Sequence, residues 1–474
     1  MRLLPLDPAA NASAEALRGF LEQCRQAAIQ AGREQLVSIS MEVDALDPLA
    51  VLESIFEPAE KHFYVERPSE HLAVAGAEEA VSFTASGPDR FAACQRFIDE
   101  TLANTLAVGD QSAPFAGPHF FSAFTFAPSV EAGEPFPAAQ VFVPRWQVGC
   151  RDGRTTAVAN LLVGATTPVA PLAERVWRAH AKFHAFDYAA PTFAPLPESP
   201  VVVCDDSAQA AAYAEAVRQA LKLEAASVFT KIVLARTREL RTSTGLHPLR
   251  VLNGLRARFA DCYAFSVANG AGQSFIGASP ERLLRVGGGV MTTEALAGSA
   301  RRGATASEDA ALGGALLHNE KDVREHRLVL DSILRRLAPL GIAPECTARP
   351  SLLRLANVQH LHVPVRAALP AGVRLLDVLA RLHPTPAVGG TPREAALPHI
   401  RELEGFPRGL YAGALGWVDA RGDGEFFVGL RSALIDGPQA RLYAGAGIVA
   451  GSQPEKELAE TDLKFRAMQD GLLA

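Results

Sequence analysis

The sequence is poor in the features that mark secreted, membrane and zinc-binding proteins. Its six cysteines are scattered over 474 residues without a C-x-x-C pair, which predicts buried thiols in a reducing compartment. The N-terminus lacks the charged and apolar regions of a secretory signal, and no apolar run approaches the roughly 20 residues of a membrane span. These absences predict a cytoplasmic protein with no membrane contact.

Basic runs and nucleotide-binding loops are missing as well. There are 46 basic against 52 acidic side chains, and no basic run exceeds a pair such as Arg301-Arg302, so nucleic acid is not an expected partner. The glycine clusters at 296–303, 387–392 and 443–452 match neither a phosphate loop nor a dinucleotide fingerprint, which disfavours ATP and NAD. With 48% hydrophobic residues, the chain has the composition of a globular protein with a large core.

The first 200 residues carry weaker patterns than the rest. The proline-rich segment 189–200 predicts a surface crossing and is the best candidate for a boundary, although it need not separate independent domains. Apolar spacing predicts one helix over residues 13–33 and strands over 36–43, 62–65, 120–126 and 140–148.

From residue 207 the pattern sharpens into long helices between short strands. We expect an alanine-rich helix over 207–224, one long helix over 305–338 that opens with a Thr305/Glu308 capping box, and a last helix that opens at Ser452. Short strands interspersed with long helices agree with an α+β class. The strands are expected over 228–240, 358–365, 413–418, 425–434 and 440–448.

Two ionisable side chains stand in apolar surroundings. Lys231 lies inside VFTKIVLAR, where burial would lower its pKa and suit a general base; the alternative is a strand lysine that reaches solvent by its stem. Glu281 lies in FIGASPERLLRV at a turn, where desolvation would keep it protonated as a general acid requires. The alternative is a turn glutamate paired with Arg282 or Arg285. Alternation along the strand would place Arg285 on the Glu281 side and Arg282 on the other.

Several glutamates lie on predicted helices. Glu325 is on the 305–338 helix, while Glu457 and Glu460 share one face of the last helix. If they meet, two or three carboxylates make an all-oxygen Mg²⁺ site, and otherwise they are solvated helix charges. Arg431 is an isolated cation in FVGLRSALI, suited to a carboxylate ligand or to a buried structural ion pair. The histidines lack metal-ligand spacing and are expected to be structural: His360, His362 and His383.

Eight ordered segments together resemble the chorismate-utilising family, which includes isochorismate, salicylate, anthranilate and aminodeoxychorismate synthases. They are KIVLAR, GASPERLL, TEALAGSARRG, NEKDVREH, LHPTPAVGGTP, LYAGALGW, LRSALI and YAGAGIVAGSQPEKELAETDLK. The N-terminal part resembles the family more faintly, in HFYVERP, FFSAFTF and VFVPRW. The resemblance implies an α+β fold of large, mostly antiparallel sheets packed together with outer helices. It also implies that residues 1–200 belong to the same fold as a chorismate-binding catalytic region at 207–474.

Within the family, the pattern is most similar to isochorismate synthases. Lys231 occupies the position of the water-activating lysine, which ammonia-using anthranilate synthases lack, and HPTPAVGG also resembles the isochorismate type. Salicylate synthases share the lysine but usually carry threonine where this chain has Ser299. The resemblance therefore implies a Mg²⁺-dependent isochorismate synthase, an isomerase that adds water at ring position 2 of chorismate and releases the hydroxyl at position 4.

The resemblance also implies a role for each matching position. Lys231 matches the base, Glu281 the general acid, and Glu325 and Glu460 the magnesium ligands, with Glu457 in a supporting role. The positions that hold the substrate are matched by Gly298, Ser299, Arg431, Gly445 and Lys464. The positions of the pocket wall are matched by Ala387, Val388 and Tyr411.

Other interpretations stay open at this point. One is a salicylate synthase, which forms isochorismate and then eliminates pyruvate. Another is a catalytically silent subunit that binds a glutaminase partner in an amidotransferase complex, although an ammonia-using enzyme has no need of Lys231. The sequence leaves open whether the product feeds menaquinone, a siderophore or salicylate, and it does not set the oligomeric state, a monomer included.

Overall fold

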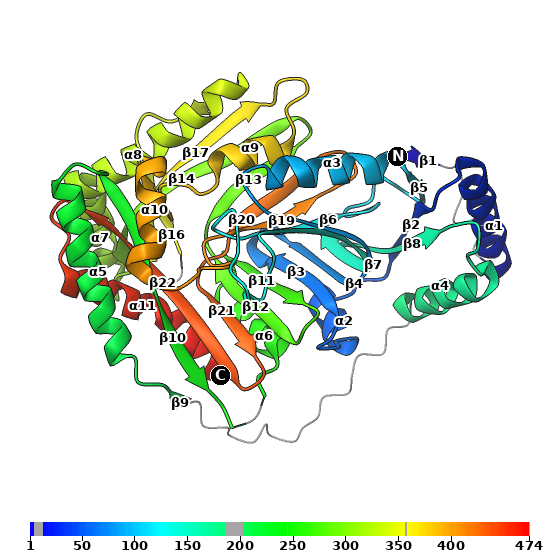
Figure 1. Cartoon of the computed structure of the whole chain (residues 1–474), viewed down its shortest axis with the longest axis horizontal. Helices are drawn as coiled ribbons and strands as arrows, with labels where there is room; N and C mark the ends of the chain where they lie inside the picture. The colour runs from blue at the N-terminus through cyan, green and yellow to red at the C-terminus, as the bar shows by residue number, and fades with distance from the viewer. Residues whose placement is uncertain (4–12, 185–201, 244, 356–357, 474) are drawn as a thin grey trace.

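The computed structural model describes residues 1–3, 13–184, 202–243, 245–355 and 358–473. Its strands form one hydrogen-bonded network (Figure 1). Among the described pairings, only β1 with β5 and β2 with β5 run parallel, so the sheets are mostly antiparallel, as predicted. The expected surface crossing at 189–200 lies outside the described residues.

Two arms of this network meet at β7 (Ala139–Arg151). One side of β7 pairs with β4, while its other side pairs first with β6 and then with β8. The first arm runs, in hydrogen-bonded order, through β1 (Arg2–Leu3), β5 (Thr105–Val108), β2 (Gln35–Val43), β8 (Arg154–Val163), β7, β4 (Leu72–Ala85), β3 (Lys61–Arg67), β11 (Tyr263–Asn269), β12 (Gln273–Ser279), β21 (Ser432–Asp436), β22 (Gln439–Val449) and β10 (Lys231–Arg241), with β9 (Val202–Val203) and β18 (Gly390–Thr391) beside β10.

The second arm begins at β6 and carries the remaining strands. It runs through β6 (Phe120–Phe124), β19 (Ala414–Val418), β20 (Gly424–Val428), β13 (Arg282–Gly287), β14 (Val290–Arg301) and β17 (Val358–Ala368), with β15 (Glu345–Cys346) and β16 (Ser351–Arg354) beside β17. Strands from the first 200 residues pair with later strands in both arms: Val65 lies opposite Phe265, and Phe121 lies opposite Trp417. The two parts of the sequence therefore share their sheets.

The helices lie outside these sheets (Figure 1). α1 (Ala14–Ala31) and α4 (Val169–His184) pack against each other at one end of the molecule. α5 (Ser207–Ala225), α8 (Glu320–Leu337), α10 (Arg393–Glu404) and α11 (Pro454–Leu473) cover strands β10, β14 and β22. The others are α2 (Pro48–Ser54), α3 (Arg90–Ala103), α6 (Pro248–Arg258), α7 (Ala306–His318), α9 (Leu375–Leu382) and the single 3₁₀ turns η1 (Pro68–Glu70) and η2 (Ala338–Leu340).

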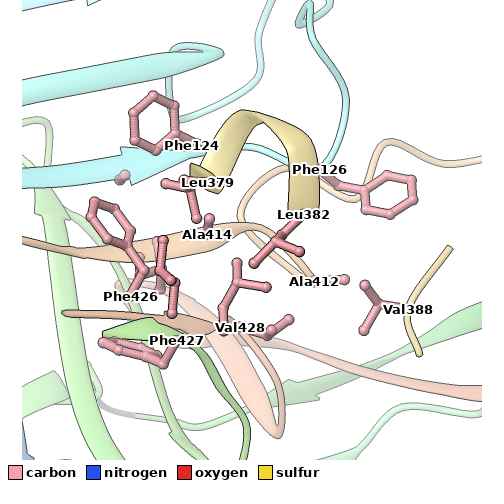
Figure 2. Close-up of a cluster of buried hydrophobic side chains, with 14 of the residues drawn as sticks. Phe124, Phe126, Leu379, Leu382, Val388, Ala412, Ala414, Phe426, Phe427 and Val428 are labelled. Atoms are coloured by element: carbon pink, nitrogen blue, oxygen red, sulfur yellow. The ribbon is translucent and has the colours of Figure 1, made fainter. Parts of the chain in front are cut away.

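The core between α9 and the second arm shows why these segments fold together. The α9 sequence LLDVLARL buries five apolar side chains, and Leu379 and Leu382 point toward the sheet (Figure 2). Full burial of one such leucine contributes about 1.5–3 kcal/mol. Phe124 and Phe426 lie on the facing strands and are fully buried. This rigid layer supports the loop that contains Val388, one of the predicted pocket-wall residues.

Two predicted elements are each divided in the structure. The helix expected over 305–338 is two helices, α7 and α8, because the side chain of Asn319 accepts hydrogen bonds from the backbone N–H groups of Lys321 and Asp322 and so starts a new helix. The strand expected over 425–434 is also wrong. The chain leaves β20 in the second arm, bends at Arg431 with a φ of 45°, and enters β21 in the first arm.

Among the described residues, no helix is long and apolar enough to cross a bilayer. All six cysteines are free thiols.

Candidate active site

A cavity of about 150 Å³ lies where β10, β14, β22, α8 and α11 come together. Its wall combines charged side chains with glycines and small apolar residues. Every predicted site residue except Glu457 lines it: Lys231, Glu281, Gly298, Ser299, Glu325, Ala387, Val388, Tyr411, Arg431, Gly445, Glu460 and Lys464.

Lys231 is the first residue of β10, and its side chain is only 2% exposed. The alternative of a strand lysine that reaches solvent is therefore wrong. Its Nζ lies 2.7 Å from Glu325 Oε1. Burial opposes ionisation of Glu325, but the charge and hydrogen bond of Lys231, together with the charges of Lys321 and Lys464, hold the pKa of that carboxyl below its usual value. Gly447 makes room for the pair, since a Cβ there would lie 3.1 Å from Lys231 Cε and 3.3 Å from Glu325 Oε1.

Glu281 occupies the turn between β12 and β13 and is 8% exposed. Burial raises the pKa of Glu281 to about 8, and the negative charge of Glu294 adds to the rise, while Lys231 and Lys464 act in the opposite direction. A carboxyl with this pKa is mostly protonated at neutral pH and can donate a proton. The structure thus places a proton donor and a buried lysine on the same cavity.

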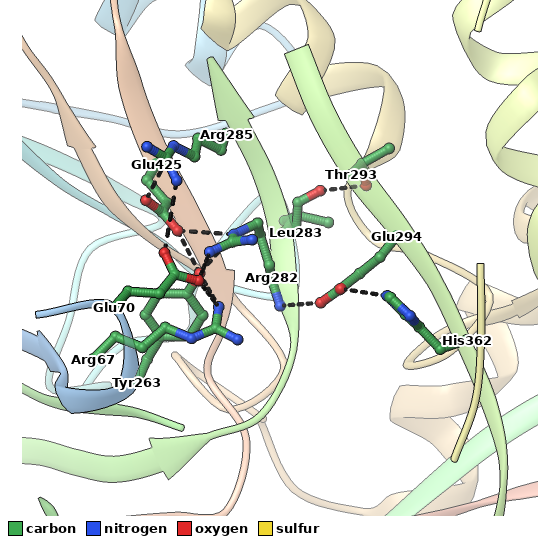
Figure 3. A network of polar contacts seen from close by, with 10 residues as sticks. All are labelled: Arg67, Glu70, Tyr263, Arg282, Leu283, Arg285, Thr293, Glu294, His362 and Glu425. Carbon is green, nitrogen blue, oxygen red and sulfur yellow. Dashed lines mark hydrogen bonds and ion pairs between the residues drawn. The ribbon is translucent and has the colours of Figure 1, made fainter. Parts of the chain in front are cut away.

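The arginines that follow Glu281 turn away from it. Arg282 and Arg285 both reach Glu70 and Glu425 on the far side of β13 (Figure 3), so the alternative of a turn glutamate paired with them is wrong. The expectation that Arg285 lies on the Glu281 side is also wrong. The pairing of β13 with β20 shifts register between Arg282 and Leu284, and this irregularity reverses the alternation of the side chains after it.

Arg431 lies at the bend between β20 and β21, where the chain passes from one arm to the other. Its Nη1 is buried and has no hydrogen-bond partner among the described residues, and no carboxylate there is among the charges that shift its pKa. Burial lowers the pKa of the guanidinium. A buried cation with an unsatisfied N–H group on a cavity wall is suited to an incoming carboxylate. The alternative, a buried structural ion pair of Arg431, is therefore wrong for the described residues.

Lys464 on α11 is a second cation on the cavity wall. Its Nζ donates to the Gly445 carbonyl over 2.7 Å and lies 2.8 Å from Glu460 Oε1. Its side chain is 38% exposed. Gly445 is needed for space as well, because a Cβ there would lie 2.9 Å from the Tyr411 hydroxyl. The carbonyl of Gly445 positions the Lys464 ammonium at the cavity wall.

His360 was expected to be structural, and its place in the cavity wall corrects that interpretation. Its Nδ1 lies 2.8 Å from the Ser299 hydroxyl and 3.3 Å from the Gly298 carbonyl. Burial lowers the pKa of His360 to about 3, so the ring is neutral, and its buried Nε2 has no partner among the described residues. The other two histidines do serve the scaffold: His362 pairs with Glu294, and His383 lies 3.3 Å from the Thr125 carbonyl.

The carboxylates expected to bind Mg²⁺ come from two helices. Glu325 on α8 and Glu460 on α11 both line the cavity. Glu457 does not; it is buried, and burial raises its pKa while a hydrogen bond with Ser452 acts in the opposite direction. Among the described residues no group of three potential ligands is preassembled. Because Mg²⁺ is commonly held by one or two carboxylates together with water and substrate oxygens, the pair on the cavity wall fits this ion.

Asp322 is an acidic neighbour that sequence reasoning missed. Burial raises its pKa, and the charges of Glu325 and Glu460 add to the rise, which places Asp322 close to both. Its side chain also packs under Gly298, where a Cβ would lie 3.1 Å from Asp322 Cβ. Asp322 is three residues before Glu325 on α8, the spacing that puts two side chains on one helix face. That spacing was the signal available in the sequence.

A buried ion pair behind the cavity was also missed. The side chains of Arg408 and Glu404 are 3% and 1% exposed and pair with each other. Arg408 donates to the carbonyls of Val388 and Val233 over 2.8 Å each, while Glu404 accepts the N–H of Ala235 over 2.6 Å. The pair therefore ties the pocket wall at Val388 to strand β10, which carries Lys231. Its sequence signal was a Glu and an Arg four residues apart.

Comparisons with known proteins agree with this geometry. A family model described as chorismate binding enzyme matches residues 20–473. The chain is 37% identical to the salicylate biosynthesis isochorismate synthase of Pseudomonas aeruginosa, over 100% of this chain and 97% of that protein. It is 30% identical to the isochorismate synthase MenF of Bacillus subtilis, over 92% and 93%. The structure of MenF, the menaquinone-specific isochorismate synthase from Escherichia coli, superimposes with a TM-score of 0.76 at 26% identity and covers 96% of this chain and 100% of that one. The chain therefore belongs to the family of chorismate binding enzymes.

Proposed function

We propose that this chain is an isochorismate synthase, which adds water at ring position 2 of chorismate and releases the hydroxyl at position 4. The observation that carries the proposal is the buried Lys231 on the same cavity as the protonated Glu281. Relatives that cover almost the whole chain are named isochorismate synthases, which supports it. An enzyme that uses ammonia would need no lysine to activate water.

Lys231 is the proposed base. It takes a proton from the attacking water, and Glu325, 2.7 Å from its Nζ, holds the side chain in place on the cavity wall. Glu281 is the proposed acid. Hydroxide is a poor leaving group, so its departure requires a proton donor already in place, and a carboxyl whose pKa is about 8 holds that proton at neutral pH.

The substrate carries two carboxylates, and the cavity offers cations to hold them. Arg431 presents a buried N–H group that no described residue of the chain bonds, and Lys464 stands at the more exposed side of the cavity. Glu325 and Glu460 would hold Mg²⁺, which supplies positive charge for a substrate carboxylate that two glutamates would otherwise repel. His360 is neutral and adds a hydrogen-bonding group without changing this balance of charge.

The test is incubation of the purified chain with chorismate and Mg²⁺ in oxygen-18 water, followed by chromatography and mass spectrometry. We expect isochorismate with one heavy oxygen at position 2. Salicylate and pyruvate would instead identify a salicylate synthase. Absence of turnover, together with co-purification of an amidotransferase, would identify a silent subunit. Either of these results overturns the proposal.

A further inference from the structure

A second carboxylate, Glu294 on β14, lies close to the proposed acid without lining the cavity. Its Oε1 accepts the backbone N–H of Arg282 over 3.0 Å, and its Oε2 lies 2.8 Å from His362 Nε2 (Figure 3). The Glu294 side chain is 12% exposed. Arg282 directly follows Glu281, so Glu294 holds the backbone at the residue next to the acid.

Two ionised carboxylates at this position would destabilise the fold. Two carboxylates close together in a poorly solvated place repel each other when both are ionised. Glu294 has two hydrogen-bonding partners of its own, the Arg282 N–H group and the His362 ring, and it also interacts with the charge of Arg67 on β3. Glu281 has no such hydrogen-bond donor among the described residues, so the proton of the pair belongs on Glu281.

The other charged groups that face Glu281 act in the opposite sense. Lys231 on β10 and Lys464 on α11 both favour the ionised form of Glu281. Tyr411 also faces Glu281 and is itself neutral, because burial raises the pKa of its phenol. Among the described residues, Glu294 is thus the one charged neighbour that favours the protonated form.

We propose that Glu294 is a positioning residue for the general acid: its hydrogen bond to the Arg282 N–H fixes the turn that carries Glu281, and its negative charge keeps the proton on Glu281. His362 holds the Glu294 carboxylate in place. This inference rests on the proposed function only where it takes Glu281 as the acid.

The first experiment is the pH profile of kcat/KM for Glu294→Gln. The amide oxygen of glutamine still accepts the Arg282 N–H, so the substitution removes the charge and keeps the anchor. We expect the alkaline limb to move to lower pH by about one unit, the scale of a nearby charge. A uniform loss of activity with an unmoved limb would mean a merely structural role and overturn the proposal. Glu402→Gln is the matched control, because Glu402 also lies beside a histidine, His399, but is 77% exposed on α10; its limb should not move.

Glu294→Asp separates the charge from the anchor. Aspartate keeps the charge but is shorter by one methylene, which draws the acceptor away from the Arg282 N–H. We expect a lower kcat with the alkaline limb close to that of the wild type. A limb that falls as far as in Glu294→Gln would contradict the assigned role of the charge. This variant also decides the question if Glu294→Gln does not fold.

A readout without turnover distinguishes this inference from the proposed function. The infrared difference between the wild type and Glu281→Gln isolates the carbonyl band of the protonated Glu281 side chain. Titration of that band should give a lower midpoint in the Glu294→Gln background, and an equal midpoint would overturn the inference. If the wild type forms no isochorismate while the midpoint still falls, the proposed function fails and the effect of Glu294 on Glu281 stands.

Discussion

Replacement of Glu281 by glutamine should raise stability and abolish activity in the same variant. The pKa of Glu281 is about 8 in the folded chain against an ordinary value of 4.5. Between these two values the folded state holds a proton that the unfolded state has released, so the stability of the wild type falls as the pH rises. Each pH unit in this window costs about 1.4 kcal/mol. The loss is therefore about 3 kcal/mol at pH 7 and about 5 kcal/mol above pH 8. Glutamine resembles the protonated form of the side chain and does not titrate. The free energy of unfolding of the variant therefore does not fall in this way as the pH rises.

Urea unfolding of both proteins between about pH 5 and pH 8 measures this difference, since a constant offset between the two proteins drops out of the comparison. The advantage of Glu281→Gln should grow steadily across the series. Chorismate turnover by the same variant should fall by about 10²–10⁴, the scale of general acid catalysis. Parallel stability profiles would refute the argument about burial, and near-native turnover would refute the role of Glu281 as the acid.

Three further predictions concern the other side chains of the cavity. Lys231→Gln should lower turnover by about 10²–10⁴ while the exposed control Lys222→Gln keeps it, both followed by isochorismate formation. Glu325→Gln and Glu460→Gln should each weaken Mg²⁺ binding in calorimetry, and full chelation should stop the wild type; activity that survives chelation would contradict the metal site. Arg431→Lys should raise the KM for chorismate about 10–100-fold, the equivalent of about 1.5–3 kcal/mol for charged hydrogen bonds, and an unchanged KM would remove Arg431 from the substrate site.

Local patterns predicted the elements of the fold well where a single rule governed them. Periodic apolar residues located α1 and α5, and runs rich in β-branched and other apolar residues located β10 and β17. The errors lie at residues that change the direction of the chain. Asn319 looks like one more polar residue in a helical run, yet its side chain caps a new helix. Arg431 lies among residues that favour strands, yet at this position the chain passes from one arm of the network to the other. This change of arm depends on pairing with strands distant in sequence, so local propensities do not predict it.

The candidate site was predictable residue by residue through the resemblance, but its internal pairing was not. Burial of Lys231 beside Glu325 depends on Gly447 and on strands that pair across 200 positions of sequence. A role for Glu294 could not be predicted, because nothing in the segment TEALAGS indicates which residues its side chain contacts in the folded chain. The β-bulge that turns Arg285 away from Glu281 likewise appears only when β13 is paired with β20.

The proposed acid and the proposed carboxylate-binding cation are held together by the way the chain changes arms. β12 lies in the first arm and β13 in the second, and Glu281 is at this crossing; β20 and β21 make the reverse crossing, with Arg431 at the bend. The crossings are hydrogen-bonded to each other, since the Val428 N–H donates to the Glu281 carbonyl and the Ala278 N–H donates to the Arg431 carbonyl, each over 3.1 Å. Main-chain bonds therefore hold together the two backbone positions that carry the proton donor and the guanidinium, which suits a site that must hold a substrate carboxylate and deliver a proton to the same ring.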